Sequence, residues 1–262
     1  MRKTRRSAGS LTAVGTGYLF GAHVTTEARI SIEKAEKLFY VVSDRLTENW
    51  LRSLNPTAET LSSCYAVGKD RRLTYEEMVE RTLAPVRAGQ RVCLAFYGHP
   101  AVCSFPPREA VRRARREGFD AVILPGISAE DCLFADLNID PSAGCQSFEA
   151  TNFVVRRHKP DVTAALILWQ VGQIGVSTYL EMELWSRKGL RILTDLLRET
   201  YPAKHKVTIY ETNFSPLSEP RLHTVTLGQL SRAPVTVGSL LYVPPLYSAP
   251  IDEEMKQRLG YG

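Results

Sequence analysis

Val14-Gly15-Thr16-Gly17 is the first of three short stretches that decide the fold, and the other two are Tyr97-Gly98-His99-Pro100 and Pro125-Gly126-Ile127-Ser128. Each follows an apolar run and places glycine where that run ends. Glycine at a strand end lets another group approach the backbone closely, and parallel sheets bind ligands at the carboxyl ends of their strands. We therefore expect the three turns to line a ligand site at one edge of a parallel sheet.

The segments around these turns alternate between strand-like and helix-like patterns, which implies parallel βαβ units. They predict a first α/β domain over residues 10–139, after a basic extension over residues 1–9 that we expect to be disordered. Strands are expected over residues 11–14, 38–42, 91–97 and 121–124. Helices are expected over residues 25–37, 47–54, 75–88, 107–117 and 129–137, the last capped by Ser128.

The second half of the chain predicts a second α/β domain with a mixed sheet, over residues 140–262, after a linker near residues 138–144. Strands are expected over residues 148–155, 164–169, 207–210 and 239–243, and one long helix over about 178–199. Trp169 and Trp185 are expected in the core. The predicted fold is thus α/β, with two domains, parallel or mixed sheets flanked by helices, and a ligand in the cleft between the domains.

The composition is that of an ordinary globular protein, with 44% hydrophobic and 23% charged residues. A net charge of +5 does not by itself imply nucleic acid. Part of the charge lies on the expected helix 107–117, in Arg108, Arg112, Arg113, Arg115 and Arg116. We expect a solvent-exposed face there and no nucleic-acid partner, because no aromatic or RNA-binding signature accompanies these arginines.

The cysteines and histidines exclude several classes of protein. The five cysteines form no CxxC pair and their number is odd, which fits reduced thiols in a cytoplasmic protein. The five histidines are scattered, without an HExxH motif, so we expect no metal site. No apolar run is long enough to span a membrane, so we expect no membrane partner.

In their order and intervals, the three glycine turns resemble those of the tetrapyrrole (corrin/porphyrin) methylase family, and the resemblance covers essentially the whole chain. Within this family the chain is most similar to the borosin peptide α-N-methyltransferases. The element Arg71-x-x-Thr74-Tyr75 contributes most to this closer likeness, because ordinary tetrapyrrole methylases lack it. Further stretches that share the likeness are Tyr65-Ala66, Asp70 to Val79, Ala129-Glu130, Gln146-Ser147-Phe148-Glu149-Ala150 and Leu168-Trp169-Gln170.

The resemblance implies S-adenosylmethionine as the methyl donor, S-adenosylhomocysteine as the product, and α-N-methylation of backbone amides in a ribosomally made precursor peptide. Fused borosin enzymes carry their peptide in a C-terminal extension, whereas this chain ends at Gly262, soon after the expected strand 240–245. We therefore expect a separate precursor peptide, acting in trans. The family also implies a homodimer, alone or in a heterotetramer with two precursor peptides.

Arg71 and Tyr75 are four residues apart and share one face of a helix if that helix reaches back to Arg71. A guanidinium stabilises a nearby phenolate. By resemblance, Tyr75 is the base or proton relay, Arg71 activates it or polarises the amide, and Arg72 could exchange roles with Arg71. Tyr65 and Tyr97 would hydrogen-bond the amide oxygen. From residue physics alone, Arg71 would be a surface charge and Tyr75 a packing aromatic.

The resemblance also implies a set of donor-binding residues, several of which have a structural alternative. His99 could instead cap its own turn, and Cys103 could belong to the core. Ser128 could be only an N-cap, and Gln170 could contact the peptide or be a buried polar group. The full set is Tyr97, His99, Val102, Cys103, Ser128, Ala129, Gln170, Thr212, Gly238 and Ser239.

Two other functions stay open at this stage. One is C-methylation of a tetrapyrrole such as a precorrin or a uroporphyrinogen, and the other is a catalytically idle fold that serves as a binding scaffold. The Arg71/Tyr75 pair favours peptide methylation, because neither alternative accounts for it.

Overall fold

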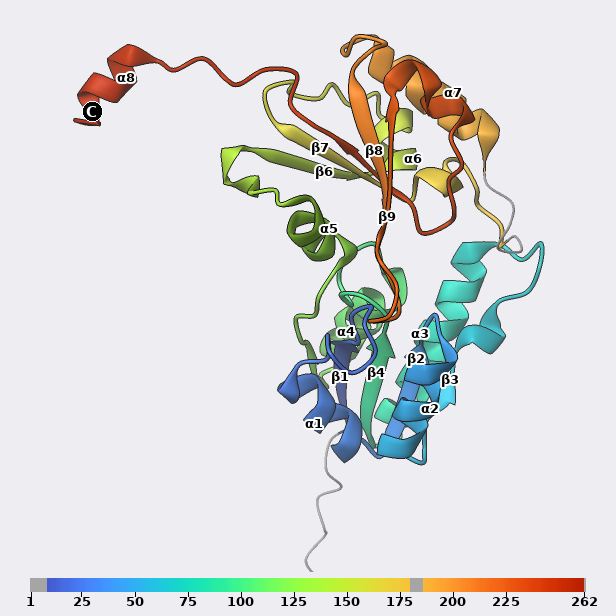
Figure 1. Cartoon of the computed structure of the whole chain (residues 1–262). Helices are drawn as coiled ribbons and strands as arrows, with labels where there is room; N and C mark the ends of the chain where they lie inside the picture. The colour runs from blue at the N-terminus through green and yellow to red at the C-terminus, as the bar shows by residue number, and fades with distance from the viewer. Residues whose placement is uncertain (1–8, 180–185, 262) are drawn as a thin grey trace, which may run out of the picture. The chain divides into compact units, whose positions relative to one another are not determined.

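The structure is a computed structural model that describes residues 9–179 and 186–261. The chain forms two compact units (Figure 1). The first comprises residues 1–138, 176–181 and 211–221, and the second comprises residues 139–175, 182–210 and 222–262. The sequence did not indicate that two late segments, 176–181 and 211–221, belong to the first unit. Most of the basic extension 1–9 and Trp185 lie outside the described residues.

The first unit is built on a five-stranded sheet of order β3-β2-β4-β1-β5, in which every neighbouring pair is parallel. The parallel βαβ arrangement predicted from the sequence is therefore confirmed. Only the short strand β3 had no counterpart among the expected strands. The strands are β1 (Ser10–Gly15), β2 (Lys37–Val41), β3 (Glu59–Thr60), β4 (Arg91–Phe96) and β5 (Asp120–Ile123).

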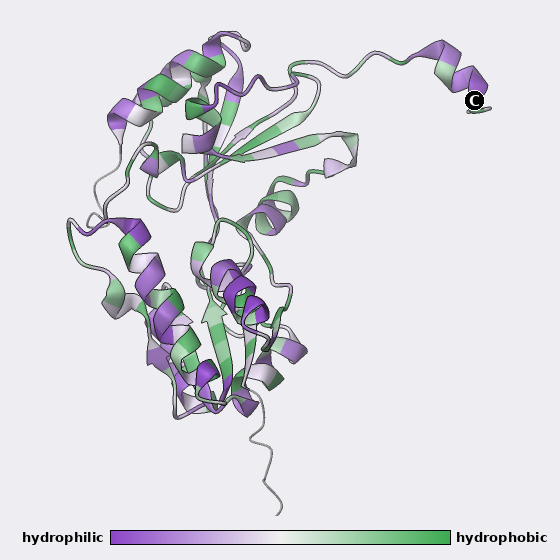
Figure 2. Ribbon diagram, turned by 180° about the vertical axis from the view of Figure 1, so that it is seen from behind, coloured by the Kyte–Doolittle hydropathy of each residue, from purple (hydrophilic) through white to green (hydrophobic). Residues whose placement is uncertain are grey.

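Helices cover both faces of this sheet. Buried residues of α3 and α4 form one apolar cluster with the strands, and buried residues of α1 and α2 form another. The strands are mainly hydrophobic, whereas the flanking helices carry hydrophilic and hydrophobic bands (Figure 2). The helices are α1 (Thr26–Lys34), α2 (Arg45–Leu54), α3 (Arg71–Arg87), α4 (Phe105–Arg116) and α5 (Ala129–Leu137), with a 3-10 turn over Ser62–Cys64.

The three glycine turns meet at the carboxyl ends of β1, β4 and β5. A Cβ atom added to Gly15 would lie 2.3 Å from the Gly98 carbonyl oxygen and 3.2 Å from the Gly126 Cα atom. One added to Gly126 would lie 3.0 Å from the Gly15 Cα atom. The prediction that the turns share one edge is correct. The structure gives a further reason for these glycines: they let the turns pack backbone against backbone.

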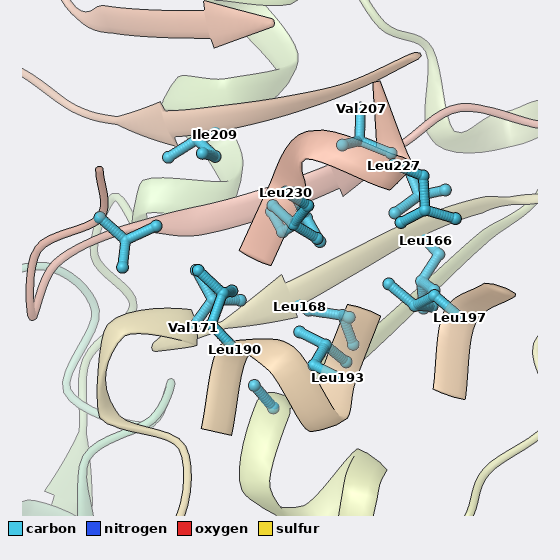
Figure 3. Close-up of a cluster of buried hydrophobic side chains, with 14 of the residues drawn as sticks. Leu166, Leu168, Val171, Leu190, Leu193, Leu197, Val207, Ile209, Leu227 and Leu230 are labelled. Carbon is cyan, nitrogen blue, oxygen red and sulfur yellow. The ribbon is translucent and has the colours of Figure 1, made fainter. Parts of the chain in front are cut away.

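The second unit contains a mixed sheet of order β6-β7-β10-β8-β9. β6 pairs with β7 in parallel, whereas β10 pairs with β7 and β8 in antiparallel fashion, so the predicted mixed sheet is confirmed. Buried side chains of β7, β8, α7 and the 3-10 turn Leu227–Arg232 form its core (Figure 3). The strands are β6 (Cys145–Glu149), β7 (Ala165–Trp169), β8 (Lys206–Glu211), β9 (Arg221–Thr226) and β10 (Leu240–Val243). The remaining elements are α6 (Ala150–Val155), α7 (Arg187–Arg198), α8 (Glu253–Arg258) and 3-10 turns over Pro141–Ala143 and Val171–Gln173.

Two predicted elements of the second half were wrong in part. The strand expected over residues 148–155 ends at Glu149, because the Glu149 carboxylate accepts hydrogen bonds from the Thr151 and Asn152 N–H groups and caps α6. The helix expected over residues 178–199 is helical only from Arg187 to Arg198 within the described residues. Its expected first residue, Thr178, instead forms a β-bridge with Asp70, and residues 180–185 lie outside the described part.

Two of the five arginines of α4, Arg112 and Arg113, pair with acidic side chains. Arg113 lies 2.6 Å from Glu76 of α3 and 2.6 Å from Glu109 of its own helix. Arg112 also pairs with Glu109, and Arg115 donates a hydrogen bond to a backbone carbonyl of β5. These ion pairs offset part of the positive charge that the sequence places on this helix.

The Glu109 cluster makes stability depend on pH. Hydrogen bonds from Arg112 and Arg113 hold the pKa of Glu109 at about 2, below its ordinary 4.5. Because the folded pKa is lowered, the stabilisation is present above about pH 4.5 and is lost as the pH falls toward 2. We expect Glu109→Gln to lower the free energy of unfolding by about 1–2 kcal/mol at neutral pH.

Denaturant unfolding at several pH values checks this prediction. The difference between wild type and Glu109→Gln should shrink as the pH falls below about 4.5. A matched control is Glu33→Gln, whose ion pair with Arg29 is exposed on both sides, so we expect little change. A difference for Glu109→Gln that stays constant with pH would contradict this account.

The close contact between Gly15 and Gly98 predicts that one methyl group added at Gly15 has a large effect on stability. Gly15→Ala should lower the free energy of unfolding by about 3 kcal/mol, because the new Cβ would collide with backbone rather than with a flexible side chain. Gly238→Ala is the control, since the nearest atom to its Cβ lies 3.8 Å away. Thermal and denaturant unfolding of both variants measures the effect, and equal stability of the two variants would show that the turns do not pack as described.

Candidate functional site

The helix that carries Arg71 and Tyr75 begins at Arg71. The Asp70 carboxylate caps it by accepting hydrogen bonds from the N–H groups of Arg72 at 2.7 Å and Leu73 at 3.4 Å. The condition set by the sequence is therefore met: α3 reaches back to Arg71, and Tyr75 lies one turn later on the same face.

A second segment holds this helix start in place. The Arg71 N–H donates to the Ser177 carbonyl at 3.0 Å, the Gly68 N–H donates to the Tyr179 carbonyl at 2.9 Å, and the Tyr179 N–H donates to the Lys69 carbonyl at 2.8 Å. Residues 177–179 thus run along residues 68–71 as a short antiparallel pairing. These backbone hydrogen bonds to residues 177–179 hold in place the loop that leads into Arg71 and Tyr75.

An aromatic row extends across this part of the first unit. The Tyr65 ring lies 4.8 Å from the Tyr179 ring and 6.4 Å from the Tyr75 ring, between ring centroids. The Tyr75 ring in turn stacks on Phe105 at 6.0 Å. The sequence indicated Tyr65 and Tyr75 but missed Tyr179 and Phe105. Phe105 could have been noticed, because it follows Cys103, a predicted donor-site residue, by only two positions.

Two of the predicted catalytic residues, Arg71 and Tyr75, affect the pKa values of the other two, Tyr65 and Tyr97. Burial raises the pKa of Tyr65 above its ordinary value, and the phenols of Tyr75 and Tyr97 raise it further, whereas the Arg71 guanidinium lowers it. The pKa of Tyr97 is raised first by burial and then by Tyr75, and is lowered by Arg71. Arg71 is half-buried, whereas Arg72 is exposed. Arg71 is therefore close enough to Tyr65 and Tyr97 to lower the pKa of each phenol.

The turn after β4 carries the next candidates. Tyr97 is 43% exposed as a whole residue, although its phenol is surrounded closely enough for its pKa to be raised. The neighbouring His99 accepts a hydrogen bond from the Ala101 N–H through Nδ1 at 3.0 Å. His99 thus caps its own turn, which was the structural alternative to a role in donor binding. This hydrogen bond uses Nδ1 and does not involve Nε2. Val102 is half-buried, and Cys103 is exposed with a left-handed φ of 48°. Such backbone is strained for a residue other than glycine, and strain of this kind concentrates at functional sites.

The start of α5 is already hydrogen-bonded within the protein. Ser128 and Asp131 form a capping box, in which the Asp131 carboxylate accepts from the Ser128 N–H at 2.7 Å. The predicted N-cap role of Ser128 is confirmed. Because a carboxylate already occupies this helix N-terminus, a neutral hydroxyl fits there better than a second anion.

Thr212 lies in the first unit although it is far from it in sequence. Its side chain is buried, and among the described residues its hydroxyl has no hydrogen-bond partner of normal geometry. It lies close enough to the Cys132 thiol to lower the pKa of that thiol, which burial raises by a larger amount. A buried hydroxyl without a partner is costly, so Thr212 is available for a ligand.

The second unit brings its own three candidates together. Gln170 follows β7 with a left-handed φ of 58°. The next residue, Val171, donates its N–H to the Ser239 carbonyl at 3.1 Å. Ser239 is buried and accepts the Thr236 N–H at 2.7 Å, and Gly238 donates to the Thr236 hydroxyl at 3.2 Å. The end of β7 and the start of the antiparallel strand β10 therefore place Gln170, Gly238 and Ser239 at one edge of the second sheet.

Within residues 9–179 and 186–261, no group of three His, Cys, Asp or Glu side chains is arranged to hold a metal ion. In the same part of the chain, every helix is too short or too polar to cross a lipid bilayer.

This fold, with candidate residues at the strand ends of both sheets, is that of a known protein family. Residues 10–216 match the family described as Tetrapyrrole (Corrin/Porphyrin) Methylases, and the chain belongs to this family. The crystal structure of a uroporphyrin-III-C-methyltransferase from Thermus thermophilus is similar in fold, with a TM-score of 0.64 over 94% of this chain and 99% of that chain. Their sequences are 18% identical, so this likeness concerns the fold alone.

Closer relatives are fungal proteins whose names pair a methyltransferase with a ribosomally synthesized peptide precursor. The chain is 40% identical to the gymnopeptides precursor of Gymnopus fusipes and 39% identical to the omphalotin A precursor of Omphalotus olearius, each over 92% of this chain and 59% of the relative. It is 38% identical to a type I borosin precursor of Serendipita vermifera subsp. bescii, over 98% of this chain and 64% of the relative. The chain thus spans about three fifths of the length of these relatives, and the resemblance to the borosin group is confirmed.

The cap of α3 leads to a prediction about the helix start. Asp70→Ala should lower the free energy of unfolding by about 1 kcal/mol and speed amide hydrogen exchange over residues 71–74, because it removes the acceptor of the first N–H groups. Asp44→Ala is the matched control, since Asp44 caps α2 by accepting from the Thr47 N–H at 2.8 Å. It should cost similar stability and leave exchange at α3 unchanged. Exchange that rises equally at α3 in both variants would argue against a local role of Asp70.

Proposed function

We propose that this chain is an S-adenosylmethionine-dependent methyltransferase that methylates backbone amide nitrogens of a ribosomally made precursor peptide. The observation that carries the proposal is the start of α3, where Arg71 and Tyr75 lie one turn apart and both act on the pKa values of Tyr65 and Tyr97. Membership of the methylase family and the names of the fungal relatives support the same reaction.

The three tyrosines have different proposed roles in the reaction. A backbone amide nitrogen is a poor nucleophile because its lone pair is delocalised into the carbonyl. Its methylation requires removal of the N–H proton and stabilisation of negative charge on the amide oxygen. Tyr65 and Tyr97, whose pKa values are raised, are protonated phenols, so they can donate hydrogen bonds to that oxygen. Tyr75 is then the residue that takes the proton, acting as its phenolate, and the Arg71 guanidinium, one helical turn away, is the compensating charge.

The methyl donor needs a site of its own. S-adenosylmethionine is a sulfonium that would supply an electrophilic methyl group when bound, leaving S-adenosylhomocysteine. The left-handed backbone of Cys103 and Gln170 and the buried Thr212 hydroxyl are features that a ligand would explain. The residues proposed to hold it are Tyr97, His99, Val102, Cys103, Ser128, Ala129 and Thr212 in the first unit and Gln170, Gly238 and Ser239 in the second.

The proposed partners are a precursor peptide supplied in trans and a second copy of the chain. A homodimer, extended to a heterotetramer by two precursor peptides, is supported by α8. This six-residue helix buries none of its residues, and Met255 on the helix is 43% exposed, while Ile251 before it and Leu259 after it are 70% and 81% exposed. A helix this short is not stable alone in water, so its apolar side is suited to another surface. The five cysteines, all within the part of the chain that the structure describes, are thiols rather than disulfides, which is consistent with a cytoplasmic location.

C-methylation of a tetrapyrrole is the second candidate. It is supported only by the fold likeness to the uroporphyrin-III-C-methyltransferase at 18% identity. It gives no role to the pairing of Arg71 with Tyr75, so the same experiment can separate the two reactions.

The test is methylation of a separate peptide encoded beside this gene, followed by mass spectrometry. Wild-type protein with S-adenosylmethionine should add methyl groups to backbone amides of that peptide. Tyr75→Phe and Arg71→Ala should each lower the rate about a hundredfold or more, because they remove the proton acceptor or its compensating charge. S-adenosylhomocysteine binding, measured by calorimetry, should change less than about threefold in both variants, since neither residue is proposed to hold the donor. Arg72→Ala should stay close to wild type, because Arg72 is exposed.

Two outcomes would contradict the proposal. One is full activity of Tyr75→Phe on the peptide. The other is methylation of uroporphyrinogen by wild-type protein that leaves the peptide unchanged, which would support the second candidate instead.

A further inference from the structure

We infer that Phe105 and Tyr179, two rings that the sequence did not indicate, are positioning residues of the proposed catalytic site: they hold the Tyr65 and Tyr75 rings from the two ends of the aromatic row. The row consists of Tyr179, Tyr65, Tyr75 and Phe105 in that order, and all four residues belong to the first unit. The inference rests on the proposed function, because the rate of peptide methylation is its readout.

The Tyr75 ring has two aromatic neighbours in different orientations. The Phe105 ring is nearly parallel to it, at 25° and 6.0 Å between centroids, and the Tyr65 ring is perpendicular to it, at 89° and 6.4 Å. Stacked and edge-on arrangements at these distances are both favourable for aromatic pairs. A rotation of the Tyr75 ring would change at least one of these contacts, so Phe105 and Tyr65 together restrict its orientation.

The Tyr65 ring is held in the same way from the other end of the row. The Tyr179 ring lies 4.8 Å from it, with an interplanar angle of 35°. Both inner rings, Tyr65 and Tyr75, also pack against the apolar cluster formed by α3, α4 and the strands. The two proposed catalytic phenols are therefore enclosed by this cluster, by each other and by one end ring each.

The backbone of Phe105 is fixed independently of its ring. Phe105 is the first residue of α4, and the buried Pro106 and Pro107 follow it in the first turn. Proline presets the helical φ angle there. Although its backbone is fixed in this way, Phe105 is 41% exposed. Removal of the ring should therefore leave the helix intact and affect mainly the stack on Tyr75.

The backbone of Tyr179 is likewise held without its side chain. Its N–H donates to the Lys69 carbonyl at 2.8 Å, and its carbonyl accepts from the Gly68 N–H at 2.9 Å. The Tyr179 ring thus projects from a segment that is already paired with the loop before α3. Loss of the ring should leave this pairing in place and free the Tyr65 ring at one side.

The proposed reaction gives these supports their purpose. Tyr75 is proposed to take the proton from an amide nitrogen while Tyr65 donates to the oxygen of the same amide, so the two hydroxyls must keep one spacing. Catalytic groups need neighbours whose packing locks their orientation, and a small misplacement is enough to slow the chemical step. Loss of an end ring should consequently lower kcat and leave binding largely unchanged.

The experiment removes each end ring and then restores a ring at the same position. Phe105→Ala and Tyr179→Ala remove the rings, whereas Phe105→Tyr and Tyr179→Phe keep them. The matched control is Phe20→Ala, because Phe20 is 38% exposed, contacts the single ring of Trp50 at 5.9 Å and is not among the proposed site residues. Methylation of the peptide encoded beside this gene gives kcat and KM, calorimetry gives the affinity for S-adenosylhomocysteine, and thermal unfolding gives stability.

We expect Phe105→Ala and Tyr179→Ala each to lower kcat about tenfold, with KM for the peptide and affinity for S-adenosylhomocysteine within about threefold of wild type. Phe105→Tyr and Tyr179→Phe should keep kcat within about twofold, because the ring and not the hydroxyl makes the contact. Phe20→Ala should lose a similar amount of thermal stability and keep the wild-type kcat.

Three outcomes overturn the positioning role and leave the proposed function standing. Wild-type kcat in either alanine variant removes the role of that residue. A rise in KM for the peptide at unchanged kcat shows that the ring contacts the substrate directly, and an equal loss of kcat in Phe20→Ala shows a general effect of stability. Failure of wild-type protein to methylate the peptide overturns the proposed function, and this inference with it.

Discussion

The contact on which the rest of the first unit depends is the packing of Gly15, Gly98 and Gly126 against one another. Their distances leave no space for a Cβ atom at Gly15, so the turns after β1, β4 and β5 converge at one point. Because the strands are parallel, all three turns lie at the same edge of the sheet. The residues that follow the glycines, among them Tyr18 and His99, are brought together without any long loop.

A second constraint fixes the start of α3. The Asp70 cap sets the first turn of the helix, and the backbone pairing with residues 177–179 holds the loop before it. Together they give Arg71 and Tyr75 one orientation relative to Tyr65. The result is a group of phenols in different environments around a single guanidinium, and different environments are what separate hydrogen-bond donors from a proton acceptor.

Much of this could be predicted from the sequence, because it follows from local patterns. The three glycine turns, the Ser128 cap and the spacing of Arg71 and Tyr75 are all properties of a few consecutive residues. The contacts of Tyr65 with Tyr179 and of Tyr18 with Phe214 join segments that are distant in the sequence. The spacing of apolar and polar residues within one segment does not indicate such pairs. The end of β6 was missed for a different reason: the run Phe148 to Val155 has strand-like composition, but the Glu149 cap turns its second part into a helix.

The most direct measurement is a crystal structure of the protein with S-adenosylhomocysteine and a peptide bound together. The account predicts that an amide nitrogen of the peptide lies between the Tyr75 hydroxyl and the donor sulfur, with Arg71 beside that hydroxyl and Tyr65 and Tyr97 pointing at the amide oxygen. A complex in which Tyr75 faces bulk water, or packs away from both ligands, would contradict it.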